Sequence, residues 1–399
     1  MKIAIMLSLV KTHAVQSKGI FTMQKVQSDI KTKAENKQAI FRHILNFGAA
    51  TKQDLFTNLG LSLPTIKQAL HVLENEQLIA EGKKVENTGG RNAVSYCVKN
   101  DGRYAIGVFP SLHHIICASV NLYGDVLCTQ RISCALNLQD TAYMNRMVDL
   151  ISAVKRETAL PDDRFLGVGI AIPSLVSPDG ETTVYGMSSN FTGVTRRFFS
   201  EYIPYPVKMY HDSETAGFAE IWRTTDRGNM IYLNLNSTIG SSFFLDGKLY
   251  TGDNIRAGEL GHVIIDPHSR RRCYCGQCGC FDAICNVAVL ESCAGGSLSR
   301  FFEQLAAEEK DIKKVWNTYT NHLALAIHNL KMMLDCTIII GGYLGAEIGP
   351  FIDDLYRKID KLSVFTPYSK AYVYPCKYKR EATAAGAALR MIDHYIDNL

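Results

Sequence analysis

The spacing of apolar residues predicts a short helical segment near the start of the chain, followed by a longer body of mixed helices and strands. In residues 36–47, apolar side chains recur three and four positions apart, as on one face of an amphipathic helix. The apolar positions are Ile40, Phe41, Ile44 and Leu45. Gly48 is expected to end this helix, because glycine readily adopts the left-handed conformation of a helix end.

Two further helices are predicted directly after the first. Thr51 opens a Thr-Lys-Gln-Asp run that suits a capping box, and the helix behind it is expected to reach Leu59. Ser62 is the expected N-cap of the next helix, with Pro64 in its first turn, where a missing N–H does no harm. The exposed polar edge of that helix consists of Thr65, Lys67, Gln68 and His71. This order of elements is typical of a helix–turn–helix whose last helix enters a major groove.

A wing is predicted after the third helix. Residues 78–80 and 95–98 have the pattern of two strands, and the segment between them is basic and rich in glycine. Its Arg91 is suited to a minor groove. The candidate DNA contacts on helix and wing are Thr65, Lys67, Gln68, Lys83, Lys84 and Arg91. The alternative interpretation is a three-helix module used for dimerisation.

From residue 104 the pattern becomes rich in strands. A first round contains predicted strands at 104–109, 115–121 and 125–132, a helix at 144–156, strands at 165–172 and 207–210, and a helix at 214–223. A second round contains strands from 230–235 through 243 and 249, a long helical pattern at 305–334, strands at 336–340 and 371–375, and a closing helix at 381–395. Two such rounds predict an α/β fold of two lobes with a cleft between them.

One short segment carries a candidate metal site. Four thiols lie within residues 273–280 and follow the imidazole of His262, and thiolate sulfur with imidazole nitrogen is the ligand set that Zn²⁺ prefers. Gly276 and Gly279 supply the tight turns that such a cluster needs. The expected zinc ligands are His262, Cys273, Cys275 and Cys280. Cys278 is a spare thiol that competes for the place of Cys280, and the alternative for the whole set is a disulfide or buried free thiols.

Length and charge suggest how these parts are divided. A chain of 399 residues is expected to form two or three domains. We expect a disordered or mis-assigned start at 1–30, a winged helix–turn–helix at 31–100, a first lobe at 101–225, and a second lobe with the zinc loop at 226–399, whose last helix can pack back on the first lobe. The net charge is +4, and residues 24–100 carry eleven Lys or Arg against seven Asp or Glu. A basic front on a mildly acidic body is typical of a DNA-binding head on a ligand-binding body.

The chain lacks the signs of export. An apolar run at the start is followed at once by Lys11 and His13 without a convincing cleavage site, and no run of about 18 apolar residues exists. Outside the zinc segment, cysteines such as Cys117, Cys128 and Cys336 lie in apolar runs, as small buried hydrophobic residues do. We therefore expect a cytoplasmic protein without a membrane span.

Two motifs carry a resemblance to a known family. Gly-Glu-Leu-Gly-His at 258–262, followed by Cys-x-Cys-Gly-x-x-Gly-Cys at 273–280, resembles the signature of the ROK family of repressors and sugar kinases. The resemblance extends from about Asn36 onward, and the Leu-Ser-x-Pro-Thr run at 61–65 is similar to that of ROK repressors. It implies an actin-like, ribonuclease-H-like fold for the two lobes. With the winged head it implies operator DNA as partner, bound by a homodimer or homotetramer.

The resemblance also implies a sugar pocket. In the family, Glu259 and His262 of the signature face the sugar, so the zinc would brace a binding loop, and no coordination site is left for an activated water. Asp212 matches the family's Asn-Asp-Ala-Asn motif, although the run here is His-Asp-Ser-Glu. The expected sugar-binding residues are Asn190, Asp212, Glu259, His262 and Asp282. Asp282 stands where the family has Glu and is one methylene shorter. Ionised carboxylates suit a polyol, because they accept hydrogen bonds from its hydroxyls.

The phosphate-binding half of the family's kinases is eroded in this sequence. The resemblance places Phe109–His113 where those kinases have Asp-x-Gly-Gly-Thr, and Asn236–Ser242 where they have a glycine-rich loop. We therefore expect no catalytic residues and a sensor, namely a repressor whose affinity for DNA responds to a sugar or sugar phosphate. Two alternatives remain: a sugar kinase with a DNA-binding head, and a DNA-binding protein controlled by a protein partner, its sugar pocket a relict.

Overall fold

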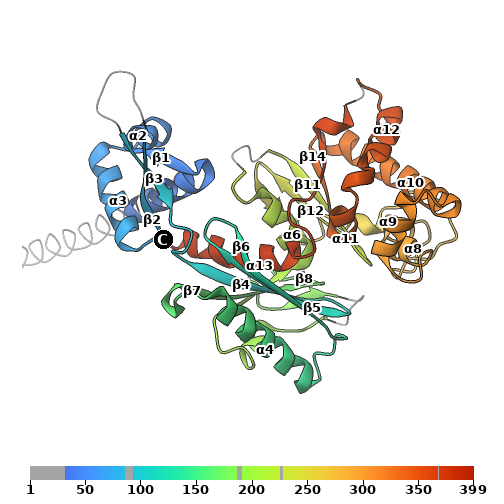
Figure 1. Ribbon diagram of the computed structural model, residues 1–399, viewed down its shortest axis with the longest axis horizontal. Helices are drawn as coiled ribbons and strands as arrows, with labels where there is room; N and C mark the ends of the chain where they lie inside the picture. Colours follow the sequence, from blue (N-terminus) through green and yellow to red (C-terminus); the bar gives the residue numbers. More distant parts are fainter. Residues whose placement is uncertain (1–31, 86–92, 187–190, 225–227, 367) are drawn as a thin grey trace, which may run out of the picture. The chain divides into compact units, whose positions relative to one another are not determined.

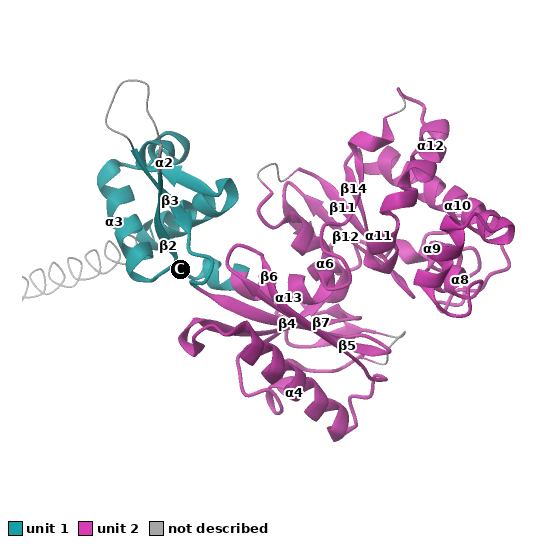
Figure 2. Cartoon of the chain, viewed as in Figure 1, with its two compact units in different colours: residues 1–102, 393–399 teal, residues 103–392 magenta. Residues whose placement is uncertain are grey.

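The chain divides into two compact units, residues 1–102 together with 393–399, and residues 103–392 (Figure 2). The computed structural model (Figure 1) describes residues 32–85, 93–186, 191–224, 228–366 and 368–399. Within these ranges every helix is too short or too polar to span a lipid bilayer.

The smaller unit is built from helices and one three-stranded antiparallel sheet of order β1-β3-β2. Its first helix is described over residues 32–47, which contain the predicted range 36–47. The other elements are β1 (Ala49–Thr51), α2 (Lys52–Leu59), α3 (Leu63–Asn75), β2 (Ile79–Val85) and β3 (Ala93–Val98). Helix, turn and helix followed by a two-stranded hairpin is the arrangement that the sequence predicted, and β1 is an addition to it.

Both predicted helix caps of this unit are confirmed. The Thr51 hydroxyl accepts the Asp54 N–H at 3.2 Å, and the Asp54 carboxylate accepts the Thr51 N–H at 2.8 Å, which completes a capping box. The Ser62 hydroxyl accepts the Thr65 N–H at 3.3 Å, and Pro64 lies in the first turn of α3. Each such cap stabilises its helix by about 1 kcal/mol. The apolar stripes of the first and third helices are fully buried.

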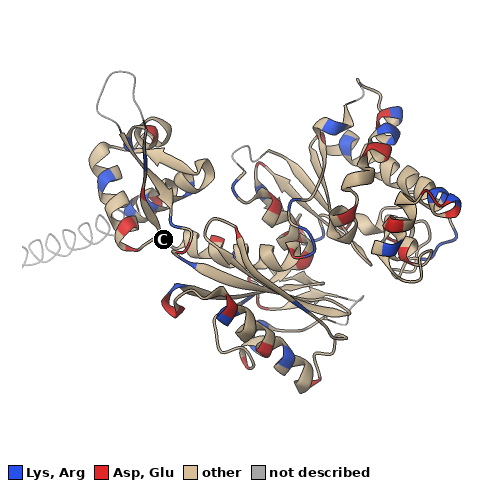
Figure 3. Cartoon of the chain, viewed as in Figure 1, with Lys and Arg blue, Asp and Glu red and all other residues tan. Residues whose placement is uncertain are grey.

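The larger unit begins with a five-stranded sheet of order β10-β7-β4-β5-β6. Its strands are β4 (Tyr104–Pro110), β5 (His114–Asn121), β6 (Val126–Ser133), β7 (Phe165–Ile172) and β10 (Val207–His211). The first three form an antiparallel meander, and β7 and β10 run parallel to β4. Helix α4 (Thr141–Thr158) covers one face with apolar side chains, while its outer side alternates acidic and basic residues (Figure 3).

Helix α13 (Ala382–Asp397) covers the other face of this sheet at very short range. A Cβ added to Gly107 would lie 1.7 Å from the Ala384 carbonyl oxygen, and one added to Gly169 would lie 2.2 Å from that of Ala387. Only glycine therefore permits this contact. The helix continues past residue 392, and its last turn belongs to the smaller unit.

A second five-stranded sheet repeats the connectivity of the first, with order β13-β12-β11-β14-β15. Its strands are β11 (Met230–Leu235), β12 (Ile239–Leu245), β13 (Lys248–Tyr250), β14 (Thr337–Gly341) and β15 (Val373–Pro375). Helices around it are α6 (Asp212–Ile221), α7 (Phe281–Cys285), α8 (Ala288–Glu291), α9 (Leu298–Ala306), α10 (Lys310–Leu334), α11 (Gly342–Glu347) and α12 (Ile352–Leu362). The repeat confirms the predicted two-lobed α/β fold.

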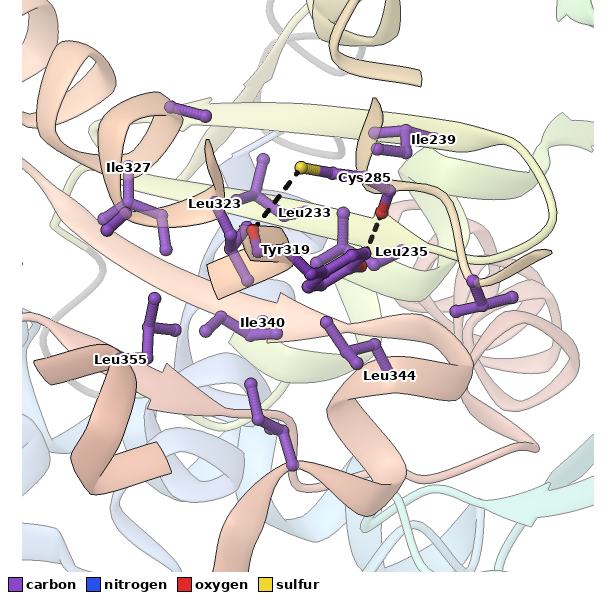
Figure 4. Close-up of a cluster of buried hydrophobic side chains, with 14 of the residues drawn as sticks. Leu233, Leu235, Ile239, Cys285, Tyr319, Leu323, Ile327, Ile340, Leu344 and Leu355 are labelled. Atoms are coloured by element: carbon purple, nitrogen blue, oxygen red, sulfur yellow. Dashed lines mark hydrogen bonds between the residues drawn. The ribbon is translucent and has the colours of Figure 1, made fainter. Parts of the chain in front are cut away.

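Figure 4 shows why the second lobe forms a single core. Leucine and isoleucine side chains of β11 and β14 pack against α10, and Tyr319 of α10 donates its hydroxyl to the Cys285 carbonyl at 2.5 Å. That bond fixes α7, which directly follows the cysteine-rich segment, onto the core. The loop that carries the candidate metal ligands is thus anchored at its far end by a buried polar contact.

Two predicted helices have different bounds. The long helical pattern predicted at 305–334 is divided between two helices, because the chain breaks between α9 and α10, where Glu308 has a positive φ of 59°. The helix predicted at 214–223 starts at Asp212 and ends at Ile221. The second difference matters for function, since it places Asp212 in the first turn of α6.

Candidate ligand-binding cleft and metal site

The larger unit contains a cleft of about 680 Å³ lined by segments of both lobes. The first lobe contributes the β4–β5 turn and the junction of β10 with α6. The second lobe contributes the β11–β12 turn, the segment around Glu259, and the starts of α9 and α11. Turns at the ends of strands thus face each other, as expected for a ligand site in an α/β fold.

Asp212 and Glu259 make one end of this cleft acidic. Asp212 follows β10 directly, and its carboxylate accepts the Ser213 N–H at 2.7 Å, which holds the side chain at the start of α6. Burial raises the pKa of Asp212, while the neighbouring His211 and the hydrogen bonds from Ser213 act in the opposite direction. Glu259 lines the same cleft from the second lobe. Both carboxylates are placed to accept hydrogen bonds from a polyol.

His211 is a cation held among carboxylates. Its Nε2 lies 3.3 Å from Asp212 Oδ1, and its Nδ1 lies 3.9 Å from Glu214 Oε1. Burial lowers the pKa of His211, but the hydrogen bond with Glu214 and the charges of Asp212, Glu214 and Glu259 outweigh it and raise the pKa to about 9. The imidazolium therefore neutralises part of the acidic end at neutral pH.

The four predicted metal ligands come together. One ligand atom from each of His262, Cys273, Cys275 and Cys280 lies within 4.8 Å of the others. His262 Nδ1 is 3.7 Å from Cys273 Sγ, and Cys275 Sγ is 3.7 Å from Cys280 Sγ. The cysteines are free thiols, so no disulfide competes. A cluster of three thiols and one imidazole could bind a metal ion.

Glycines and an excluded thiol define this cluster further. A Cβ on Gly279 would lie 2.0 Å from the Asp266 carbonyl oxygen, and both Gly276 and Gly279 have positive φ, so the turns depend on glycine. Cys278 is exposed, and its Sγ faces the Arg270 carbonyl at 3.9 Å. The structure therefore has Cys280 rather than Cys278 in the cluster.

His262 joins the metal cluster to the cleft. Its Nδ1 faces the thiols, while its Nε2 lies 3.1 Å from the Tyr274 hydroxyl and 3.8 Å from Glu259 Oε2. Tyr274 and Glu259 line the cleft, whereas His262 itself stands behind them. Tyr274 was missed in the sequence, where only its position between two cysteine ligands could have drawn attention to it.

Asp282 does not take the place expected of a sugar ligand. Its side chain is 4% exposed and is not part of the cleft lining. Its carboxylate accepts the Ile239 N–H at 2.6 Å, so it fixes the β11–β12 turn to α7. The aspartate side chain is one methylene shorter than glutamate, and its carboxylate binds this backbone N–H instead of lining the cleft. The predicted contact of Asn190 lies outside the described residues.

The two runs expected to have replaced phosphate loops both lie in the cleft wall. Pro110 ends β4, and the Ser111 hydroxyl closes the following turn by accepting the His114 N–H at 3.1 Å. In the second run, the Asn236 side chain accepts the Tyr343 N–H at 2.7 Å, and the Ser242 hydroxyl donates to the Ser213 carbonyl at 3.0 Å. Side chains of both runs are thus engaged with the protein itself.

Basic side chains also line the cleft, which sequence reasoning missed. Arg131 Nη2 lies 2.7 Å from His114 Nε2, and His113 lines the cleft beside them. Arg131 is far from the histidines in the sequence, but antiparallel pairing of β5 with β6 places Arg131 opposite Ile116, two residues from His114. Alternate residues share a face, so the two side chains meet.

The candidate DNA contacts lie on the smaller unit. Lys67 and Gln68 are exposed on α3, and Thr65 is half-buried beside Ser62. Lys83 is exposed on β2. The Lys84 side chain and Arg91 lie outside the described residues.

Comparisons with known proteins agree with this fold. The model of the ROK family matches residues 106–393. The chain is 22% identical over 377 residues to a xylose repressor of Bacillus spizizenii, covering 92% of this chain and 97% of that protein. It is 24% identical over 263 residues to an N-acetylglucosamine repressor of Escherichia coli O6:H1, covering 64% of this chain and 63% of that protein.

Solved structures extend the similarity. A ROK family transcriptional regulator, described as a homologue of the Escherichia coli MLC protein, matches with a TM-score of 0.72 and 21% identity, covering 92% of this chain and 98% of that one. A ROK family glucokinase of Streptomyces griseus, solved with glucose and AMPPNP, matches with a TM-score of 0.62 and 17% identity, covering 72% of this chain and 98% of that one. With the family model covering most of its length, this chain belongs to the ROK family.

Proposed function

We propose that this protein is a transcriptional repressor of the ROK family whose affinity for operator DNA responds to a sugar or sugar phosphate. One observation carries the proposal: a helix–turn–helix unit and a cleft with polyol-accepting carboxylates belong to one chain, and helix α13 has residues in both units. The similarity to proteins named as a xylose repressor and an N-acetylglucosamine repressor supports it.

The smaller unit is the DNA-binding head in this proposal. Lys67 and Gln68 are exposed on α3, which is capped and packed as recognition helices are. Lys83 extends the basic surface along β2, and Thr65, Lys84 and Arg91 are proposed as further contacts. Two heads are needed to read a palindromic operator, so we propose that the protein acts as a homodimer or homotetramer.

We propose that the ion held by the cysteine cluster is Zn²⁺. His262 with Cys273, Cys275 and Cys280 supplies the borderline and soft donors that zinc prefers, in a set that fills a tetrahedron. When bound, zinc braces the loop without offering a position for an activated water. The protein residues then do the recognition: His262 supports Tyr274 and Glu259, which face the cleft.

The proposed link between cleft and head runs through two helices. Asp212 lies in the first turn of α6, and a Cβ on Gly386 of α13 would lie 1.8 Å from the Thr215 carbonyl oxygen of α6. At the other end of α13, Asp393 and Asp397 pair with Arg42 of the first helix at 2.9 and 2.5 Å. A ligand that favours one position of α6 therefore biases α13, by no more than its differential affinity for the two states.

A sugar kinase is the second candidate, because Asp212 and Glu259 are retained and a ROK glucokinase shares the fold. Against catalysis, the β4–β5 turn has Pro110, which lacks an N–H donor, and the side chains of Asn236 and Ser242 bond to the protein where phosphate would need free backbone. A coupled assay with ATP and common hexoses separates the two functions, since turnover would establish the kinase.

The direct test of the proposal is DNA binding. The wild-type protein should select duplexes of a defined sequence from a random pool. Gln68→Ala should weaken binding to that sequence more than it weakens binding to random DNA. At least one sugar should change the affinity of the protein for the selected duplex. The sugars to test are glucose, N-acetylglucosamine and xylose, each with and without a terminal phosphate. The proposal fails if no duplex is selected. If a duplex is selected but no sugar changes its binding, and calorimetry detects no sugar binding, the sensor part of the proposal is wrong. The remaining hypothesis is then a regulator controlled by a protein partner, with a relict sugar pocket.

A further inference from the structure

Glu220 is a buried carboxylate outside both the cleft lining and the His/Cys cluster. It lies in the last turn of α6 and is 4% exposed. Its Oε1 accepts the backbone N–H of Lys377 at 2.9 Å and that of Tyr378 at 3.1 Å, and its Oε2 lies 3.1 Å from the Lys377 nitrogen. Burial raises the pKa of Glu220, while these two amides and the charges of Lys377 and Lys379 act in the opposite direction. The amides therefore stabilise the ionised carboxylate where it lies.

The two amides lie where the chain returns from the second lobe to the first. Lys377 and Tyr378 follow β15 of the second sheet and precede α13, which covers the first sheet. Directly before them, the Cys376 N–H donates to the Ile340 carbonyl of β14 at 2.9 Å. The Tyr378 hydroxyl donates to the Gly124 carbonyl, in the turn between β5 and β6, at 2.7 Å. Three consecutive residues are thus bonded to both sheets and to α6.

The end of α6 is the other crossing between the lobes. Trp222 and Arg223 follow the helix, and the chain then enters β11 of the second sheet. The Arg223 guanidinium carbon lies 3.2 Å from the centroid of the Tyr123 ring, and a Cβ on Gly124 would lie 2.5 Å from Trp222 Cδ1. Both crossings therefore contact the β5–β6 turn, and Glu220 bonds one crossing to the other.

Helix α6 connects these crossings with the cleft. Asp212 lines the cleft from its first turn, and Glu220 lies in its last turn, about 12 Å further along the helix axis. Helices α6 and α13 lie side by side (Figure 1), so closely that a Cβ on Gly386 would lie 1.8 Å from the Thr215 carbonyl oxygen. Close-packed helices transmit a displacement to each other. A shift of α6 thus reaches α13 at Gly386 and, through Glu220, at the residues that lead into α13.

We infer that Glu220 is the positioning residue of a hinge between the two lobes: it holds the amides of Lys377 and Tyr378, so that the start of α13 follows α6 when a ligand binds in the cleft. The inference rests on the proposed function and deepens it by naming a contact through which regulation passes. Glutamate suits this role because both of its oxygens accept hydrogen bonds, whereas glutamine offers one oxygen and turns an NH₂ group toward the donors. Without the contact, the lead into α13 moves independently of α6, and the ligand no longer biases the helix that ends in the smaller unit.

Glu220→Gln in the full-length protein tests the inference. The readout is the coupling factor, defined as the factor by which a sugar changes the affinity for an operator duplex selected from a random pool. The sugar is the tightest-binding member of glucose, N-acetylglucosamine, xylose and their terminal phosphates. Wild type should give about fivefold or more, and the variant should fall to within about twofold of one, with sugar affinity changed by less than about threefold. A residue that only stabilised the fold would lower the melting temperature and leave the coupling factor unchanged.

Thr158→Val is the matched control. The Thr158 hydroxyl lies 2.6 Å from Ser119 Oγ and donates to the Val154 carbonyl at 2.7 Å, on the face of the first sheet that α4 covers. The change removes a part-buried hydrogen bond of the same lobe, away from both crossings. It should lower the melting temperature and keep the wild-type coupling factor.

Hydrogen exchange in the wild-type protein decides the question even if Glu220→Gln does not fold. The amides of Lys377 and Tyr378 should exchange slowly both with and without sugar, because their contact with Glu220 persists through the change. The Lys379 amide is the internal comparison, since it donates to the Glu381 carboxylate at 3.3 Å in an exposed hydrogen bond. It should exchange faster than the two amides that Glu220 holds.

Four results overturn the inference. A wild-type coupling factor that persists in Glu220→Gln rejects the hinge contact and leaves the proposed function intact. A factor that falls as far in Thr158→Val as in Glu220→Gln also rejects it, as does fast exchange of the Lys377 and Tyr378 amides in either state. A wild-type factor of one with every sugar overturns the proposed function as well.

Discussion

Two groups of cleft residues carry opposite chemistry, namely the carboxylates of Asp212 and Glu259 and the basic side chains of the β5–β6 hairpin. The acidic end starts α6 with Asp212 and adds Glu259 from a loop anchored by the cysteine cluster. The basic side chains lie on a hairpin, in which the pairing of β5 with β6 brings His114 and Arg131 together and Ser111 bonds to the His114 backbone in the preceding turn. The carboxylates thus depend in part on a loop organised by four ligand atoms, and the basic side chains depend on strand pairing.

This difference shows how the site can diverge. The resemblance to the ROK family lies in the acidic end, whose residues lie beside the His/Cys cluster and at a helix start. The hairpin turn that carries basic side chains can change them without disturbing a core, because the sheet holds the backbone in place. We therefore expect the acidic end to resist change more than the side chains of the hairpin turn do.

The largest loss of stability is expected when a ligand of the His/Cys cluster is removed. Cys280→Ser should lose the metal and destabilise the larger unit by about 3 kcal/mol or more, because metal binding contributes to folding. Metal content after gel filtration, with a thermal melt, measures both. Cys278→Ser is the matched control and should keep its metal, since Cys278 faces away from the cluster. Unchanged metal in Cys280→Ser would overturn the ligand assignment.

The next largest effect is expected on ligand binding, when a carboxylate charge of the cleft is removed. Glu259→Gln is expected to weaken ligand binding by about 1.5–3 kcal/mol, since an ionised acceptor makes the stronger hydrogen bonds. Glu214→Gln is the comparison within the same end, because Glu214 faces His211 rather than the cavity. Calorimetry should show a much smaller loss for it. Equal losses for the two variants would mean that net charge, and not contact, decides binding.

His211 should make the acidic end sensitive to pH. Its pKa is raised to about 9, above the ordinary value of 6.5, so its contribution to stability is full below pH 6.5 and is lost as pH rises through 9. Wild type should lose on the order of 2 kcal/mol relative to His211→Asn between pH 6 and pH 10. Chemical denaturation at both pH values measures this. Parallel pH profiles for the two proteins would contradict the ion pair with Asp212.

The smallest effect on stability is expected at the far end of α13. Arg42→Gln breaks the pairs with Asp393 and Asp397 and should cost about 1 kcal/mol or less, as partly exposed ion pairs do. Its effect on coupling should be larger: ligand should still bind but should no longer shift DNA affinity. Arg197→Gln removes an exposed pair on the short helix α5 (Arg196–Ser200) and serves as the control. A full ligand response in Arg42→Gln would exclude this link.

Local signals let much of the fold be predicted from the sequence. The capping residues Thr51 and Ser62 fixed helix starts, because their side chains bond to backbone three residues away. The strands β7 and β11 have the predicted bounds, since continuous apolar runs are buried on both faces. The cysteine and glycine spacing likewise predicted a cluster that forms within one loop.

Features that depend on distant contacts could not be predicted. Asp282 turned inward because a donor on Ile239 lies within its reach, which no local pattern reveals. Arg131 and His114 meet only through strand register. The break between α9 and α10 occurs at Glu308, a residue with no local signal for a left-handed conformation. In each case the outcome depends on contacts between residues far apart in the sequence, which local sequence patterns do not contain.

Linkage between the cleft and the DNA-binding head is the central claim, and it can be measured from both sides. The affinity for a selected operator duplex is titrated with and without the tightest ligand of the panel, and the affinity for that ligand is titrated with and without the duplex. The two ratios should be equal and about fivefold or more, because coupling between two binding sites is reciprocal. Ratios of one in both directions would contradict the account, even if DNA and sugar each bind tightly.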